Sequence, residues 1–132
     1  MYHPRMNAFN QTFHKMFEEV TAHIEERYGS RYPLHPARPP HGSTSSRQSD
    51  GLFNIGADFT PGYGSKYGRG YLIDVHMATL EKVPHEVRWE IVEEVVRKIN
   101  ELLPVYFPDR ELEVFSEGTH FKICGDFSLG NV

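Results

Sequence analysis

The chain has 132 residues, of which 39% are hydrophobic, 13% aromatic and 24% charged, and its formal net charge is −4 with histidine neutral. This length suits one domain with a single core, so we expect residues 1–132 to form one. The acidic balance excludes nonspecific binding of nucleic acid through overall charge. No apolar run approaches the roughly 20 residues that span a bilayer. The sole cysteine, Cys124, excludes an internal disulfide, and we expect a soluble cytoplasmic protein.

An amphipathic helix is predicted over about residues 7–28. Apolar residues recur there at spacings of three and four, the period of one helix face, and Gly29 follows as a C-terminal cap. The opposite face is expected to contact water. The apolar face comprises Phe9, Phe13, Met16, Phe17, Val20 and Ile24, and the polar face His14, Lys15, Glu18, Glu19 and Glu25.

Residues 31–51 are predicted to form a long loop, because prolines and then a serine-rich run suppress regular structure. Loops of this length inside a domain are usually functional or disordered. The run 45–50 offers hydroxyl groups, and Arg47 offers a guanidinium that could bind a phosphate or a carboxylate. The alternative is a simple connector.

Two strands are predicted over residues 52–59 and 71–79. In both, apolar residues occupy odd positions and polar residues mainly even ones, which is the period of a strand with one buried face. We expect the strands to pair as a hairpin centred near Ser65. This register places Asn54 opposite His76 and Gly56 opposite Asp74.

The loop over residues 60–70 is rich in glycine, tyrosine and basic residues, which favours contact with an anion. It lacks the spacing of a Walker motif and leads into a strand rather than a helix. An ordered loop without a ligand is the alternative. The expected ligand-binding residues are Tyr63, Lys66, Tyr67 and Arg69, together with Arg47.

A second helix is predicted over residues 84–103, with Pro84 in its first turn and Pro104 ending it. Two more alternating strands follow over residues 111–116 and 119–126. The order α-β-β-α-β-β predicts a two-layer α+β fold, a four-stranded, mainly antiparallel sheet with both helices packed on one face. The other face is expected to be open and polar.

That open face carries the candidate residues for chemistry. Asp74 and His76 point the same way from one strand, which makes them the candidates for acid/base catalysis. With Asp58 or His120 they could instead bind a divalent metal through oxygen and imidazole ligands. Plain solvation of a polar sheet face is the alternative.

Three hypotheses for function follow. The leading one is a small binding domain whose Gly/Tyr/basic loop contacts a phosphorylated metabolite or single-stranded nucleic acid. The second is a metal-assisted or acid/base enzyme on the open sheet face. The third is an oligomerising or scaffolding domain, which the apolar stripes of the second helix support. A homodimer is the expected form of such an assembly.

Overall fold

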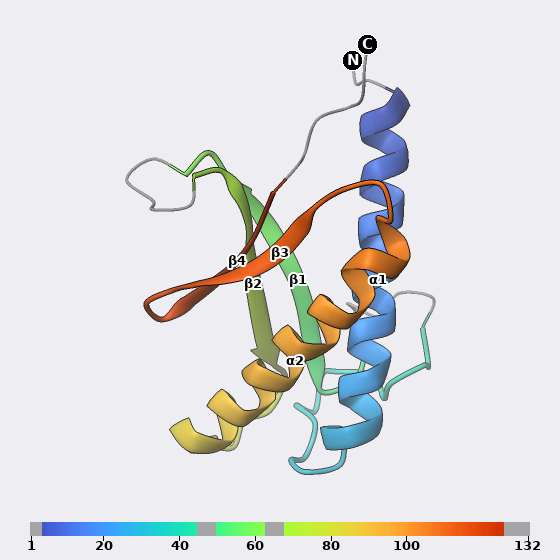
Figure 1. Cartoon of the computed structure of the whole chain (residues 1–132). Coiled ribbons are helices and arrows are strands. Elements are labelled where there is room, and N and C mark those ends of the chain that lie inside the picture. Colours follow the sequence, from blue (N-terminus) through green and yellow to red (C-terminus); the bar gives the residue numbers. More distant parts are fainter. Residues whose placement is uncertain (1–3, 45–49, 63–67, 126–132) are drawn as a thin grey trace.

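Two helices and four strands follow one another in the predicted order α-β-β-α-β-β, and the α+β fold is confirmed (Figure 1). The computed structural model describes residues 4–44, 50–62 and 68–125. The elements are α1 Pro4–Tyr28, β1 Phe53–Thr60, β2 Gly70–Met77, α2 His85–Tyr106, β3 Leu112–Glu117 and β4 His120–Gly125.

The sheet has the strand order β1-β2-β4-β3, and every neighbouring pair is antiparallel. β1 and β2 pair along their whole length in the predicted register, with Asn54 opposite His76 and Gly56 opposite Asp74. The predicted hairpin is therefore confirmed.

The junction between the two hairpins is short. β2 and β4 pair at only two positions, Tyr71 with Ile123 and Leu72 with Lys122. Past Leu72 the two strands diverge, and β3 and β4 extend away from the remainder of β2 (Figure 1). The fold is thus two antiparallel hairpins joined near the end of β2 that follows the Gly-rich loop.

Both helices lie on one face of the sheet, where their apolar stripes form the core (Figure 1). Burial of these side chains supplies the main drive for folding, at about 25 cal/mol per Å² of apolar surface. The most deeply buried members include Met16, Val20 and Ile24 of α1, Ile91, Val95 and Ile99 of α2, and Phe53, Ile55 and Ile123 of the sheet.

Helix α2 does not stop at Pro104, so the predicted end is wrong, and the helix continues to Tyr106. Proline lacks an N–H and removes one helical hydrogen bond. Leu102 and Leu103 are only 5% and 2% exposed, and the Phe107 N–H donates to the Leu103 carbonyl at 2.8 Å. Packing of this last turn outweighs the missing bond.

The second face of the sheet is not open along β4, which corrects a further expectation. Lys122 and Cys124 are 1% and 4% exposed. The backbone at Gly70 lies against both, since a Cβ there would be 2.9 Å from Lys122 Cγ and 3.0 Å from Cys124 Sγ. The Lys122 ammonium donates to the Gly68 carbonyl and lies 3.2 Å from Glu117 Oε2. The chain entering β2 therefore covers this face.

Candidate functional site

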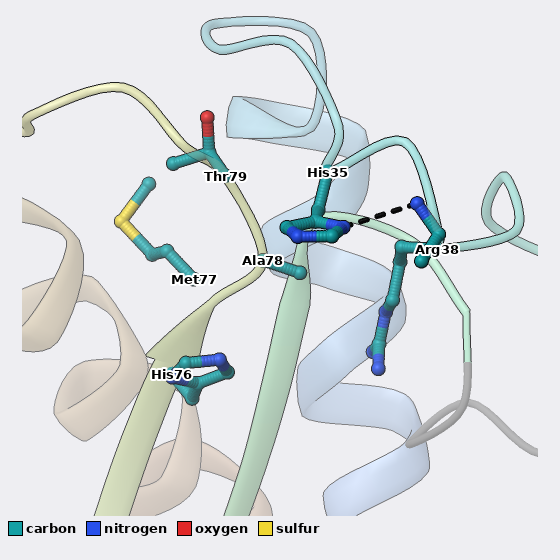
Figure 2. A pocket seen from close by; sticks show the side chains of 7 residues that line it. His35, Arg38, His76, Met77, Ala78 and Thr79 are labelled. Atoms are coloured by element: carbon teal, nitrogen blue, oxygen red, sulfur yellow. Dashed lines mark hydrogen bonds between the residues drawn. The ribbon is translucent and has the colours of Figure 1, made fainter.

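A hollow of about 350 Å³ lies where β2 ends, at the end of the β1–β2 hairpin opposite to the Gly-rich loop. The loop that follows α1 passes over the end of β2 at this point (Figure 2). It contributes His35, Ala37 and Arg38 to the wall, and β2 with the segment after it contributes His76, Met77, Ala78 and Thr79.

His35 is fixed in the hollow by its own backbone and by a neighbour. Its N–H donates to the Ala78 carbonyl at 2.8 Å, which attaches the loop to the end of β2. Its Nδ1 accepts the Ala37 N–H at 3.0 Å. A neutral imidazole that accepts through Nδ1 carries its proton on Nε2, so the ring retains a hydrogen-bond donor. Pro36 restricts His35 to an extended backbone and so favours this arrangement.

Arg38 joins the middle of the same loop to the end that leads into β1. Its Nε donates to the Gly51 carbonyl at 2.9 Å, and its Nη2 donates to the carbonyls of Asp50 at 2.9 Å and Phe53 at 3.4 Å. These partners are backbone dipoles rather than carboxylates. Within the described residues the guanidinium charge is therefore not neutralised by an ion pair.

The lining of the hollow favours negative charge. Figure 2 shows His35, Arg38 and His76 grouped about Ala78, with Thr79 beyond them. Two imidazoles, a guanidinium and a hydroxyl thus line one space, and no carboxylate does so among its described residues. Imidazole and guanidinium N–H groups are the donors that bind phosphate and carboxylate oxygens.

Of the two residues predicted for acid/base catalysis, His76 lines this hollow and Asp74 does not. Both side chains are exposed on the same face of β2, two positions apart. In the described part of the chain no hydrogen bond links them, so the structure does not assemble them into a catalytic pair.

The four candidate metal ligands are not brought to one place. Had the β2–β4 ladder continued past Leu72 and Lys122, Asp74 would face His120, but the strands separate there. Asp58 is on β1, where it pairs with Leu72, and β1 and β4 flank opposite edges of β2. Among the residues that can be described, no three His, Cys, Asp or Glu side chains form a group able to hold a metal ion.

Most of the residues predicted to bind an anion lie outside the described residues. They are Tyr63, Lys66 and Tyr67 of the Gly-rich loop and Arg47 of the serine-rich run. Arg69 is described and is exposed next to the start of β2. The base of the loop is closed tightly, because a Cβ on Gly62 would lie 2.1 Å from the carbonyl carbon of Gly68. Glycine is required at Gly62 for this approach and for its φ of +82°.

A second polar cluster was not predicted. Glu25 was expected to face water, which is wrong, because its side chain is 3% exposed. Its Oε1 accepts the Leu52 N–H at 3.0 Å, and its Oε2 accepts the Phe53 N–H at 3.4 Å. His41 Nδ1 lies 3.7 Å from Glu25 Oε2 and 3.7 Å from Asp50 Oδ1. The cluster therefore joins α1 to the middle of the loop at His41 and to its end at residues 50–53.

The two buried carboxylates have pKa values shifted in opposite directions. Burial raises the pKa of Glu25 above 4.5, although the two backbone N–H groups that it accepts work against this. Burial would also raise the pKa of Asp50, but hydrogen bonds from the Thr44 hydroxyl and from the N–H groups of Thr44 and Gly42 outweigh it and lower this pKa below 3.8. The difference follows from the number of donors that each carboxylate accepts.

An apolar hollow of about 580 Å³ lies between α2 and the turn that joins β3 to β4. Trp89 is 37% exposed there, and its ring lies 5.6 Å from that of Phe121 and 6.5 Å from that of His85. If the protein forms oligomers, as the third hypothesis holds, this surface of α2 is where a second copy would pack. Neither helix of the described chain is long and apolar enough to cross a bilayer.

The fold and the histidine-lined hollow define an α+β protein of two antiparallel hairpins beneath two helices. A family model described as "Uncharacterised protein" matches residues 4–125, and the chain belongs to this family. A protein of Borreliella burgdorferi with the name "Uncharacterized protein" is 34% identical over 123 residues, which is 93% of this chain and 96% of that protein. No solved structure matches this chain.

Proposed function

We propose that this protein binds a small anion, such as the phosphate group of a phosphorylated metabolite, in the hollow formed by His35, Arg38, His76 and Thr79. The observation that carries the proposal is the lining itself: two histidines and one arginine line a hollow of about 350 Å³, with no carboxylate among the described lining residues. A phosphate there would accept several charge-assisted hydrogen bonds.

The size of the hollow favours a small molecule over nucleic acid. Pockets for small ligands commonly measure about 300–1,000 Å³, and this one lies at the low end of that range. Binding of a nucleic acid strand requires a basic track along the surface, whereas the chain carries a formal net charge of −4. A phosphorylated metabolite is therefore the favoured form of the anion.

The Gly-rich loop remains a separate hypothesis. It lies at the other end of β2, whose eight residues span about 23 Å at roughly 3.3 Å per residue. One phosphate cannot contact both ends of the hairpin. Contacts from Lys66 and Arg69 would therefore need a longer ligand or a second anion.

The proposal is tested by titrating the protein with inorganic sulfate at low ionic strength, following backbone amide shifts by NMR. Sulfate keeps the same charge over the working pH range, so changes in affinity report the protein alone. His35→Ala and His76→Ala should each raise the Kd about tenfold, since a hydrogen bond to a charged group contributes roughly 1.5–3 kcal/mol.

His120→Ala is the matched control, because His120 is an exposed histidine on β4 that does not line the hollow. It should leave the Kd unchanged. Shifts that map to residues 35–38 and 76–79 would support the site. Sulfate affinity that is equal in all four proteins, or no binding at millimolar sulfate, would refute the proposal.

A further inference from the structure

We infer that Glu25 of α1 is a positioning residue for the anion pocket, acting through the backbone of residues 50–53 and the guanidinium of Arg38. This inference rests on the proposed function of the hollow. Glu25 is buried and lines a different hollow. We nevertheless infer that it controls the affinity of the anion pocket formed by His35, Arg38, His76 and Thr79.

The first step is the attachment of Glu25 to the start of β1. Its carboxylate accepts the N–H groups of Leu52 and Phe53 at 3.0 and 3.4 Å. The approach is close, because a Cβ on Gly51 would lie 1.9 Å from Glu25 Oε2. Gly51 also has a φ of +78°, which glycine adopts readily. The carboxylate thus occupies the space that a side chain at residue 51 would need.

The second step is the attachment of Arg38 to the same short stretch. Arg38 donates to the carbonyls of Asp50, Gly51 and Phe53, and the Gly51 N–H donates to the Pro39 carbonyl at 2.8 Å. Phe53 is therefore held through its N–H by Glu25 and through its carbonyl by Arg38. Moving this backbone must move the guanidinium that lines the pocket.

His41 adds a contact on the α1 side of the loop. It lies 3.7 Å from carboxylate oxygens of both Glu25 and Asp50, and its side chain is 35% exposed. Together with Glu25 and Glu26 it lines a hollow of about 560 Å³. The loop is thus fixed to α1 at His41, while His35 and Arg38 of the same loop line the hollow together with His76. Loss of the α1 contacts would loosen Arg38 and, through the loop backbone, disturb His35, which keeps its own hydrogen bond to the Ala78 carbonyl.

The test compares Glu25→Ala and Glu25→Gln with the native protein in sulfate titration and amide hydrogen exchange. Glu25→Ala should raise the sulfate Kd about tenfold, accelerate exchange at Leu52 and Phe53 at least tenfold, and shift the ring resonances of His35. Glu25→Gln keeps an oxygen acceptor and should restore most of the affinity. Glu26→Ala is the matched control, because it removes the neighbouring exposed carboxylate and should change none of these values.

Two outcomes would overturn the inference: a sulfate Kd unchanged in Glu25→Ala, or an equal loss of affinity in Glu26→Ala. Should Glu25→Ala fail to fold, His41→Ala takes its place, because it removes the side chain that lies 3.7 Å from both Glu25 and Asp50. It should raise the sulfate Kd, and an unchanged Kd would overturn the inference. Should the native protein bind no sulfate, the proposed function fails, but the exchange rates of Leu52 and Phe53 and the His35 resonances still decide whether Glu25 positions Arg38 and His35.

Discussion

The imidazole Nε2 of His23 on α1 lies 2.6 Å from the carboxylate Oε2 of Glu94 on α2. The same oxygen accepts a hydrogen bond from Arg97 at 2.7 Å. These contacts lower the pKa of Glu94 to about 2. The hydrogen bond from Arg97 is the largest cause, and the one from His23 adds to it. The contact therefore connects the two helices through a carboxylate that the fold keeps ionised.

Glu94→Gln should reduce stability at neutral pH and matter less in acid. The pKa of Glu94 is lower in the folded protein, about 2 against 4.5, so its contribution is present above about pH 4.5 and is lost as the pH falls toward 2. The free energy of unfolding, measured with urea at pH 6, 4.5 and 3, should show the gap between native protein and variant closing as pH falls. A constant gap would show that ionisation of Glu94 does not contribute.

Glu25→Gln should show the opposite slope. Burial raises the pKa of Glu25 in the folded protein, so its favourable contribution is present below pH 4.5 and is lost as the pH rises through the raised value. The stability of the variant relative to the native protein should thus increase between pH 4 and pH 7. Urea unfolding under the same conditions tests this, and a slope equal to that of Glu94→Gln would contradict the assignment.

The register of the first hairpin could be predicted because it depends on local periodicity and on symmetry about the loop. Odd residues are apolar on both strands, so a one-residue slip would expose one of the two sets. The centre of the loop near Ser65 then selects among the pairings that remain. The same reasoning failed for Lys122, because burial of the second face of β4 depends on how Gly70 approaches it. Contacts between distant segments leave no periodic signal.

The candidate sites were predicted less well for the same reason. His76 was selected from its strand, but its partners His35 and Arg38 come from a loop that has no periodicity. The sequence did hold one signal for His35 and Arg38: both lie in a Pro-rich stretch, where proline restricts the backbone and can fix side chains in place. Glu25 carried no such signal, because the polar Thr21, four residues before it on α1, is seen to be buried only in the structure.

Val75→Asp should unfold the protein, whereas His76→Ala should leave it folded. Val75 packs against the core and pairs with Ile55, which is 0% exposed. A charge there would cost several kcal/mol, comparable to a domain's total stability of about 5–15 kcal/mol. His76 is exposed, and its removal should change the unfolding free energy by about 0.5 kcal/mol or less. Circular dichroism with thermal melts checks both, and equal destabilisation would mean that the faces are reversed.

The double change Lys66→Ala with Arg69→Ala should leave sulfate binding in the histidine pocket unchanged. The two ends of β2 are about 23 Å apart at roughly 3.3 Å per residue. The sulfate titration of this variant is therefore run at 0.1 M ionic strength, where charges are screened over about 10 Å. Removing two cations at the loop end should therefore alter the sulfate Kd less than twofold. The same protein should be titrated with a short single-stranded oligonucleotide at low salt. Loss of oligonucleotide binding with retained sulfate binding would establish two separate anion sites, whereas loss of sulfate binding would place the anion at the loop and remove the pocket from consideration.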